Sequence, residues 1–473
     1  MLQVARRVLQ ENGFDPDFPA GIEATVPARD PLESARDMRD LPWSSIDNED
    51  SRDLDQIEVA ERLPDGAIRV YVGIADVDAL VPKGSPIDKH AALNTTSLYT
   101  GVHTFPMLPL LLSTGRTSLL EDGTPRLSIV TEYVVQSDGA LDDAHTKIYA
   151  ALVTNRAKLV YERVGAWLEG KGETPHGGPE ISEQLKLQDE VAQRLRELRI
   201  QHGSLQLETI EANPVMENGQ VVGLEVQEQN RARQLIEDLM VASNGATARY
   251  LEKRGRSAVR RVVAKPKRWE RIVELAKTLG TVLPTDPDAK ALSAFLEARR
   301  AADPLRFPDL SLSIVKLLGP GQYVLQRATD NAQGHFGLAV DDYSHSTAPN
   351  RRYPDLITQR LLKAAAAEVD APYSDSELAV IANHCTERED ASRKVERTMR
   401  KVAAAQLLST RIGEEFDSIV TGASDNGVFV RLLKPPAEGR VVRGEQGLDV
   451  GDRVRVKLVD TDPSRGFIDF ARA

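Results

Sequence analysis

An acidic segment held between apolar residues places the strongest constraint on how this chain can fold. Residues 46–58 contain six carboxylates within thirteen positions, and four of the six are aspartates. Ile46, Leu54 and Ile57 interrupt the acidic run, so we expect a loop anchored in a core and not a solvated tail. Residues 67–78 are rich in β-branched side chains and follow a Pro-Asp-Gly turn, which predicts a strand shortly after the acidic loop.

The spacing of the aspartates suits a hard divalent cation. Asp53 and Asp55 are two residues apart, and in an extended segment such residues face the same side. Asp47 would return from the other end of the loop, and Asp50 is a candidate fourth ligand. Mg²⁺ prefers oxygen ligands and is commonly bound by one or two carboxylates together with substrate phosphates. The alternative is a solvated acidic turn, and this is the more common explanation of an acidic run that is considered in isolation.

The rest of the chain has the pattern of a mixed α/β domain followed by a small β-barrel. A further strand is expected at 127–135. Helical periodicity covers 184–200, 232–251, 269–279, 356–369 and 377–408, the last as two helices or one with a break. After Gly413, short apolar segments alternate with turns at 416–421, 427–433, 453–460 and 466–471. Four or five short strands in about 60 residues predict a barrel.

Three basic clusters accompany the acidic loop. Arg351 and Arg352 follow a proline-fixed turn, an arrangement suited to bidentate contact with phosphate. A second cluster, 393–401, would align four cations on one helix face, either as a solvated face or as a wall against a polyanion. The third lies at 260–268. Phosphodiester hydrolysis can use both carboxylates that bind a metal ion and cations that bind phosphate.

Bulk properties narrow the class of protein. The formal net charge of −11 argues against a surface covered in positive potential, but a local basic channel remains compatible with it. Cys385 is the single cysteine, so no disulfide can form within the chain, and we expect an inert thiol on a helix and not a nucleophile. Because no stretch approaches about 18 apolar residues, we expect no membrane span and a cytoplasmic location.

Several motifs, in the correct order, resemble those of the ribonuclease II / ribonuclease R family of exoribonucleases. The resemblance covers about residues 35–410, and the β-rich tail resembles the S1-type OB fold that ends many members. The motifs are Ile46-Asp47 through Asp53-Leu54-Asp55; Gly73-Ile74-Ala75-Asp76-Val77; Thr96-Ser97-Leu98-Tyr99 with Phe105-Pro106-Met107-Leu108-Pro109; Leu235-Ile236-Glu237-Asp238-Leu239-Met240 with Ala242, Ser243 and Asn244; and the segment 343–355.

The resemblance implies a fold, a reaction and a cofactor. The fold class is α/β (mixed α+β): a short helical segment at 1–34, an RNB-type catalytic domain at 35–410 and an all-β S1-type OB-fold barrel at 411–473. The reaction is processive 3′-to-5′ hydrolysis of RNA to nucleoside 5′-monophosphates, with Mg²⁺ and with Mn²⁺ as a possible substitute. The partner is single-stranded RNA, and the chain is expected to be a monomer. The N-terminal segment, which has a helix-turn-helix-like pattern, would contact RNA or, as we favour, pack on the catalytic domain.

Site residues follow by position in the motifs. Asp47, Asp53 and Asp55 match the metal-binding aspartates, with Asp53 and Asp55 also assigned to catalysis. Arg351 matches an arginine that contacts the phosphate near the scissile bond. Tyr99 matches a tyrosine that packs against terminal bases and sets the length of the final product. Glu396 is similar to a glutamate near the 3′-terminal nucleotide, and Gln56 is added as a substrate-binding residue.

Two departures from the family pattern affect these expectations. The usual motif ends in consecutive aspartates, and Gln56 replaces the second, which leaves the number of metal ions open. Asp50 is the candidate to compensate. Because the acidic loop begins at Ile46, the two cold-shock folds of typical members have no room before it, so we expect a more open entrance that admits structured RNA with a 3′ overhang.

Two other classes of protein stay open. The first is a family member that has lost catalysis at Gln56 and acts as an RNA-binding or regulatory protein. The second is a metal-binding scaffold with no role in RNA metabolism, which leaves the barrel and the basic clusters unexplained. Phe416 and Phe429 are candidate base-stacking residues of the barrel, and either could equally belong to its core.

Overall fold

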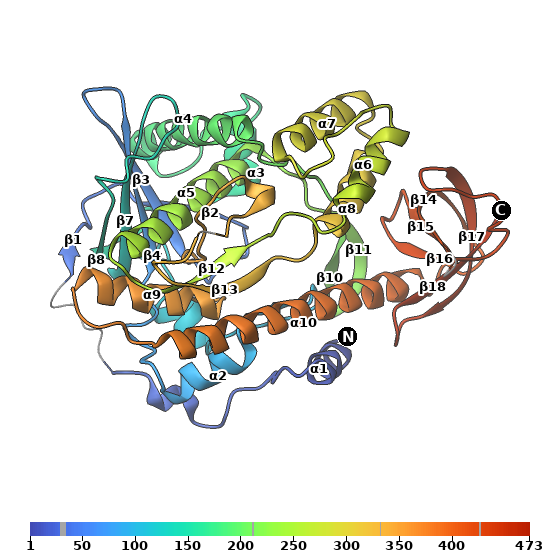
Figure 1. Cartoon of the computed structure of the whole chain (residues 1–473). Coiled ribbons are helices and arrows are strands. Elements are labelled where there is room, and N and C mark those ends of the chain that lie inside the picture. Colours follow the sequence, from blue (N-terminus) through green and yellow to red (C-terminus); the bar gives the residue numbers. More distant parts are fainter. Residues whose placement is uncertain (29–34, 211, 332, 425–426) are drawn as a thin grey trace.

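The computed structural model describes residues 1–28, 35–210, 212–331, 333–424 and 427–473, and a mixed sheet lies on the side of the molecule away from the C-terminal barrel (Figure 1). Among these residues the sheet has seven strands in the order β1-β8-β7-β4-β3-β2-β9. Their bounds are β1 Arg36–Asp37, β2 Ser44–Asp47, β3 Gln56–Arg62, β4 Ile68–Ala75, β7 Arg126–Val135, β8 Lys147–Val153 and β9 Ala157–Val160. The strands expected at 67–78 and 127–135 are confirmed as β4 and β7.

Helices cover both faces of this sheet. The bounds are α2 Pro86–Asn94, α3 Tyr161–Leu168, α4 Gly178–Gln201, α5 Arg231–Lys253 and α9 Tyr353–Ala366. Helices α3, α4 and α5 pack on one face, around Ile46, Ala60 and Val72. Helices α2 and α9 pack on the other, around Ile57 and Val59. Because successive residues of a strand point to opposite faces, β3 contributes side chains to both cores. Strands that are buried on both faces in this way have nearly continuous apolar sequences.

Helix α10, Asp375–Leu408, runs along the molecule as one continuous helix and leads into the barrel (Figure 1). Ser374 and Glu377 form a capping box that fixes its start. Val395, Met399 and Val402 form a buried seam at i, i+4 and i+7. The expectation of two helices, or of one with a break, is wrong: the helix is continuous, because no Gly or Pro interrupts the segment. Cys385 lies buried on it, and burial raises the pKa of its thiol, so the expectation of an inert residue is confirmed.

The N-terminal segment packs on the catalytic domain at two separate places. Helix α1, Leu2–Glu11, packs on α10 through Ala5, Val8 and Leu9. The short strands β5, Leu98–Tyr99, and β6, Thr104–Phe105, contribute to the same cluster. In place of the second helix of the expected helix-turn-helix-like pattern there is a four-residue 3-10 turn, η1 Ile22–Thr25, which packs against α2. The two elements therefore do not form a helix-turn-helix pair.

The remaining helices and hairpins lie between the sheet and the barrel. Helices α6 Trp269–Thr278, α7 Ala289–Ala302 and α8 Phe307–Leu318 share their own small core. The paired strands are β10 Ala212–Glu217 with β11 Gln220–Val226, and β12 Ala258–Val262 with β13 Gln322–Gln326. Short helical turns occur at η2 Leu112–Arg116 and η3 Phe336–Leu338. None of the helices within the described ranges combines the length and apolarity that a bilayer-spanning helix requires.

Five strands close into a barrel at the C-terminal end, in the order β14-β15-β16-β18-β17. Their bounds are β14 Glu415–Ser424, β15 Gly427–Leu432, β16 Glu438–Arg443, β17 Arg453–Asp462 and β18 Phe467–Arg472. The expected four segments are present, and β16 is the one that pattern alone missed, because only two of its six residues are apolar. Phe416 is part of the barrel core, and Phe429 is half-buried, so Phe416 is excluded as a stacking residue.

Candidate active site

The acidic loop joins the end of β2 to the start of β3, and its apolar anchors are fully enclosed. Ile46, Leu54 and Ile57 are at most 1% exposed. Ser118 fixes the middle of the loop, since its Oγ accepts from the Leu54 N–H at 2.9 Å and donates to the Arg52 carbonyl at 2.6 Å. The expected anchored loop is confirmed, and its carboxylates are presented from a rigid support.

Asp47 and Asp50 differ in how the loop holds them. Asp47 ends β2, and its Oδ1 accepts from the Asn48 N–H and the Ser51 hydroxyl, both at 2.7 Å. These bonds orient one carboxylate oxygen and leave the other for a further partner. Asp50 lies exposed in the turn that follows. Its exposure gives no support to its assignment as a fourth ligand.

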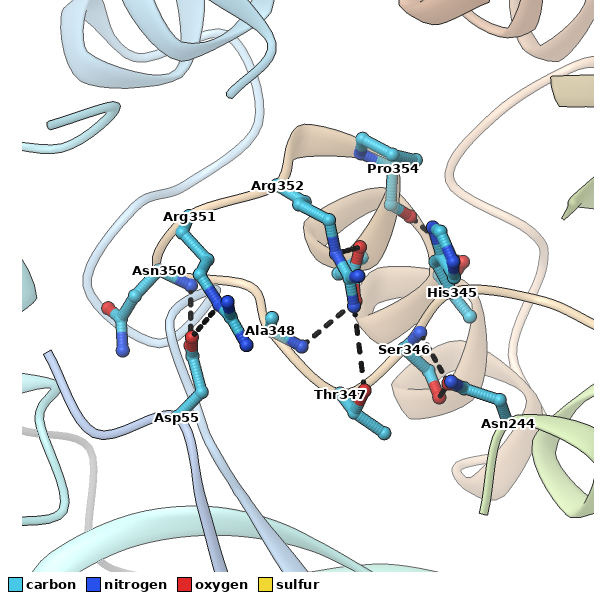
Figure 2. Close-up of polar contacts among 12 residues, drawn as sticks. Asp55, Asn244, His345, Ser346, Thr347, Ala348, Asn350, Arg351, Arg352 and Pro354 are labelled. Atoms are coloured by element: carbon cyan, nitrogen blue, oxygen red, sulfur yellow. Dashed lines mark hydrogen bonds and ion pairs between the residues drawn. The ribbon is translucent and has the colours of Figure 1, made fainter. Parts of the chain in front are cut away.

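Asp55 is the most enclosed carboxylate of the loop, with 1% of its surface exposed. Its Oδ1 accepts from the backbone N–H of Asn350 at 2.9 Å, and its Oδ2 accepts from Arg351 Nε at 3.2 Å (Figure 2). Two segments almost 300 positions apart in the sequence therefore meet at one carboxyl group. The Arg351 side chain keeps 44% of its surface exposed, so its guanidinium is still accessible to a phosphate.

The segment that carries Arg351 is pinned along its length. Asn244 on α5 accepts from the N–H and the hydroxyl of Ser346, at 2.9 and 2.8 Å (Figure 2). Asp355, in the first turn of α9, accepts from the Ala348 N–H at 2.9 Å and from both Arg352 Nε and Nη2, at 2.8 and 2.7 Å. Arg352 is therefore engaged in holding this segment and is not free to grip phosphate as expected, whereas for Arg351 the expectation stays a prediction.

Tyr99 lies beside the acidic loop. Its hydroxyl donates to Asp53 Oδ2 at 3.3 Å, and 43% of its surface is exposed, as a base-stacking residue requires. The N–H of Ser97 donates to the Arg351 carbonyl at 2.9 Å, so the strand that carries Tyr99 is tied to Arg351. Glu396 lies on α10, which contacts β5, and its Oε1 accepts from the Ser392 hydroxyl at 3.3 Å.

The electrostatics of the site favour a bound cation. Burial raises the pKa of Asp55 to about 7, although the Arg351 charge and the Asn350 N–H both act to lower it. Burial also raises the pKa of Asp53, and the neighbouring Asp47 charge adds to the rise. Arg351 thus does not offset the effect of burial on these carboxyl groups. A divalent cation bound close to them would favour their charged forms.

A metal at this position would need ligands from its substrate. Within the described ranges, no three Asp, Glu, His or Cys side chains stand close enough to form a metal site on their own. Mg²⁺ usually retains waters and takes one or two carboxylates together with substrate phosphates, so the residues present fit that mode of binding. Gln56 begins β3 next to Asp55, is 5% exposed, and contributes an amide where a carboxylate was expected.

The basic cluster at 260–268 divides into two buried arginines and three exposed cations. Arg260 and Arg261 lie on β12 and are 4% and 8% exposed. Arg261 makes two hydrogen bonds to Glu389 on α10, at 2.6 and 2.9 Å. These two arginines are paired with partly exposed carboxylates, and Arg261 ties β12 to α10, so they are not available to hold phosphate as expected. Lys265, Lys267 and Arg268 are exposed, and for them the expectation stays a prediction. Arg393, in the cluster on α10, is likewise paired with Glu389.

Comparisons with known families agree with this geometry. A family model described as the RNB domain matches residues 35–368, and one described as the RNase II-type exonuclease C-terminal S1 domain matches residues 414–473. The chain belongs to the RNB-domain family. The fold class and the resemblance expected from the motifs are thereby confirmed.

Named relatives share much of the chain. Ribonuclease R of Thermotoga maritima is 30% identical over 99% of this chain and 69% of its own length. Ribonuclease R of Escherichia coli K12 is 29% identical over 96% of this chain and 59% of its own length. Ribonuclease R 1 of Lactococcus lactis is 28% identical over 92% of this chain and 56% of its own length. The chain thus spans between 56% and 69% of the length of these three relatives.

Solved structures show the same fold. The apo form of Mycoplasma genitalium RNase R aligns with a TM-score of 0.88 and 23% identity, over 100% of this chain and 78% of that one. The same protein in complex with double-stranded RNA aligns with a TM-score of 0.88 and 24% identity, over 100% and 83%. Yeast Ssd1, a pseudonuclease, aligns with a TM-score of 0.73 and 16% identity, over 98% and 57%. The fold alone therefore does not decide between an active and an inactive protein.

Proposed function

We propose that this chain is a metal-dependent exoribonuclease that hydrolyses RNA from the 3′ end and releases nucleoside 5′-monophosphates. The observation that carries the proposal is the meeting of Asp55 with the Asn350 N–H and Arg351 beside two further loop aspartates. It combines a cation site with a phosphate-binding arginine, which are the two requirements of metal-assisted phosphodiester hydrolysis. Mg²⁺ is the proposed ion, and Mn²⁺ would substitute for it.

Each side chain has a defined role in this proposal. Asp47, Asp53 and Asp55 hold the metal ion, which when bound lowers the pKa of a water molecule and neutralises the scissile phosphate. Arg351 places its exposed guanidinium against the phosphate oxygens and stabilises the charge that develops on them. Tyr99 stacks on a base near the 3′ end, an interaction worth about 1–3 kcal/mol. Glu396 contacts the terminal nucleotide.

The proposed substrate is single-stranded RNA, including a 3′ overhang on a duplex. Solved structures of a relative with the same fold hold ribose-methylated single-stranded RNA and double-stranded RNA, which supports the choice of both substrates. Degradation that stops at the duplex junction, under conditions where single strands disappear completely, would restrict the proposal to single strands.

A gel time course with 5′-labelled single-stranded RNA and Mg²⁺ tests the activity. The comparison is between the wild type, Asp55→Asn, and Asp50→Asn as the matched control from the same loop. We expect the wild type and Asp50→Asn to shorten the RNA progressively to a small 5′ fragment, and Asp55→Asn to bind RNA without shortening it. Cleavage by Asp55→Asn at the wild-type rate would overturn the proposed site.

The second candidate function is that of an RNA-binding protein without catalysis. Gln56 removes one carboxylate from the site, and the pseudonuclease Ssd1 has the same fold, so both observations favour this function over that of a metal-binding scaffold. RNA that stays intact in the same time course, while binding is retained, would establish this second function. Gln56→Asp would then be the variant expected to create activity.

A further inference from the structure

A pocket outside the acidic loop lies between the end of α4, the end of β12 and the start of α7. Its volume is about 650 Å³, which is within the usual range of small-molecule sites. The His335 N–H donates to the Val340 carbonyl at 2.7 Å, and the Phe336 N–H donates to the Val263 carbonyl at 2.9 Å. These backbone hydrogen bonds close the loop 335–340 and tie it to the residue that follows β12, so this wall of the pocket is formed without a ligand.

One part of the pocket lining is apolar. Val263, Phe336 and Val340 line the pocket and are half-buried, so each keeps some apolar surface for a ligand. The Phe336 ring packs edge-on against Trp269, with the ring centroids 6.3 Å apart, which helps to fix its orientation. An aromatic ring held in this way can stack on a planar ligand.

His335 adds a hydrogen-bond donor at a defined position in the lining. Its Nδ1 accepts from the Leu338 N–H at 3.1 Å, so the proton of the neutral ring lies on Nε2. Burial lowers the pKa of His335 to about 4, and the Arg261 charge lowers it further, so the ring is neutral at pH 7. Nε2 has no hydrogen-bond partner among the described residues and is left for a ligand.

Two lysines bring positive charge to the pocket. Lys265 follows β12, and Lys290 lies in the first turn of α7. Both are exposed, and neither forms an ion pair with another described residue. Asp341 is the one acidic side chain among the described lining residues, and His202 adds a further positive charge when it is protonated. Because the whole chain carries a net charge of −11, a pocket with two unpaired cations stands out as a site for an anion.

We propose that this pocket binds a nucleotide. The base stacks on Phe336 and accepts a hydrogen bond from His335 Nε2. The phosphate lies between Lys265 and Lys290. An inorganic anion would leave the apolar part of the lining unused, and an uncharged ring would leave the two lysines without a partner, whereas a nucleotide combines a planar base with an anionic phosphate. The nucleotide is either a free nucleoside 5′-monophosphate or one unit of a bound RNA strand. The inference goes beyond the proposed function and does not rest on it, because the acidic loop takes no part.

Isothermal titration calorimetry of the full chain with AMP tests the site, in EDTA so that no metal ion contributes. We expect one AMP to bind, and Lys265→Ala and Lys290→Ala each to weaken its binding by about tenfold, the lower end of the effect of losing a hydrogen bond to a charged group. Lys267→Ala, at an exposed lysine outside the lining, is the matched control and should keep wild-type affinity. Adenosine, which lacks the phosphate, should bind equally well to the wild type and to both lysine variants.

Phe336→Leu tests the base and not the phosphate. Leucine keeps an apolar side chain against the small core of α6, α7 and α8 but removes the stacking face. We expect it to weaken the binding of AMP and of adenosine alike, by about 5–100-fold. Thermal unfolding of each variant confirms that it is folded, and the lysine variants test the site independently of any change in this core.

Two results would overturn the inference. The first is that the wild type does not bind AMP, or binds it no more tightly than the two lysine variants do. The second is that Tyr99→Ala abolishes AMP binding while the lysine variants retain it, which would place the ligand at the acidic loop. Competition with ribose-methylated single-stranded RNA then identifies the source of the nucleotide. Displacement of AMP supports a unit of an RNA strand, and simultaneous binding supports a free nucleotide. Because the titration needs neither metal nor hydrolysis, its failure and the failure of the proposed exoribonuclease activity are distinguishable.

Discussion

At the scale of the residue, Asp55 carries two demands that oppose each other. The proposed function requires it to be ionised so that it can hold a cation, yet it is almost completely enclosed, and enclosure favours its neutral form. The Arg351 guanidinium and the Asn350 N–H only partly restore the charged form, since the pKa stays at about 7. Asp55 therefore titrates where an enzyme of this kind is expected to work.

The rate of RNA hydrolysis should accordingly depend on pH and on Mg²⁺ together. Below about pH 7 Asp55 is protonated and cannot bind the ion, so at low Mg²⁺ the single-turnover rate should rise through pH 7. Because the cation and the proton compete for one carboxylate, higher Mg²⁺ should shift the midpoint to lower pH. The measurement is a pH series between 5.5 and 8.5 at two Mg²⁺ concentrations. A midpoint independent of Mg²⁺ would contradict it.

The same pKa has a consequence for stability. The folded pKa of Asp55 lies above the value of about 4 expected in the unfolded chain. The folded state therefore binds more protons between these values, and without metal the free energy of unfolding should fall as the pH rises from 4 to 7. Asp55→Asn should flatten this part of the curve.

Arg351 and Arg352 are adjacent, but their surroundings differ: the Arg351 guanidinium is partly exposed, whereas Arg352 is bonded to Asp355. Arg351→Lys should lower the single-turnover rate by about 10²–10³-fold, the usual effect of losing one donor to developing charge, and leave RNA affinity nearly unchanged. Arg352→Lys should instead lower the midpoint of thermal unfolding, because Arg352 makes two hydrogen bonds to the buried Asp355. Single-turnover kinetics and thermal unfolding of both variants check the assignment; similar profiles for the two would refute it.

Sequence reasoning found the residues that carry charge and missed those that position them. The spacing of the loop aspartates, Arg351 and Tyr99 within their motifs sufficed to name them. The Asn350 N–H could not be named, because a backbone donor has no identity in the sequence. Asn244 and Asp355 lie within the motifs but were given no role, because each belongs to a helix, where a polar residue is normally assigned to the surface.

At the scale of the element, α10 connects the catalytic layer to both chain ends. Its buried seam packs against α1 and against the segment that carries Tyr99, through Leu98 and Phe105. Met399 is fully buried in this seam. A cavity there would loosen the support of Tyr99 as well as destabilise the fold.

Met399→Ala should therefore lower the free energy of unfolding by about 2–5 kcal/mol, the range for large-to-small substitutions in a core. It should also lengthen the final RNA product, because a less rigid Tyr99 stacks more weakly and short products dissociate earlier. Urea unfolding and the product length at completion are the measurements. Ala403, buried on the same helix outside this seam, offers the control Ala403→Gly for a general loss of helix stability. If Ala403→Gly lengthens the final product by the same amount, the effect of Met399→Ala on product length does not act through Tyr99.

Elements with strong periodicity were predicted correctly, and those defined by their partners were not. Helices α4, α5, α6 and α9 and strands β4 and β7 have patterns that local sequence determines. Strand β12 was not predicted, and its two arginines were interpreted as part of an exposed basic cluster. Their ion pairs with Glu252 and Glu389, which come from other parts of the chain, allow them to be buried, and local sequence does not show these partners. Strand β16 has only two apolar residues, so its own pattern does not predict a strand. It forms because it pairs with β15 and β18 in the closed barrel.

At the scale of the whole molecule, RNA binding must work against an acidic chain. The net charge is −11, and residues 414–473 contain 11 acidic and 9 basic side chains, so the barrel has no excess of positive charge. Base stacking on exposed aromatic residues would let the barrel bind RNA without such an excess and without a preference for sequence. Phe467 on β18 is 58% exposed, whereas Phe416 is enclosed in the barrel core.

Phe467→Ala should therefore weaken the binding of long single-stranded RNA by about 5–100-fold, which corresponds to the loss of one stacked base. The slope of affinity against salt should stay the same, because no phosphate contact is removed, whereas each lost phosphate contact would change it by about 0.7. Fluorescence anisotropy over a salt series measures both quantities. Phe467→Trp, which retains a stacking face, should keep wild-type affinity. A reduced salt slope in Phe467→Ala would instead indicate that the barrel binds through charge, and the aromatic face would then have no part in guiding RNA to Asp55.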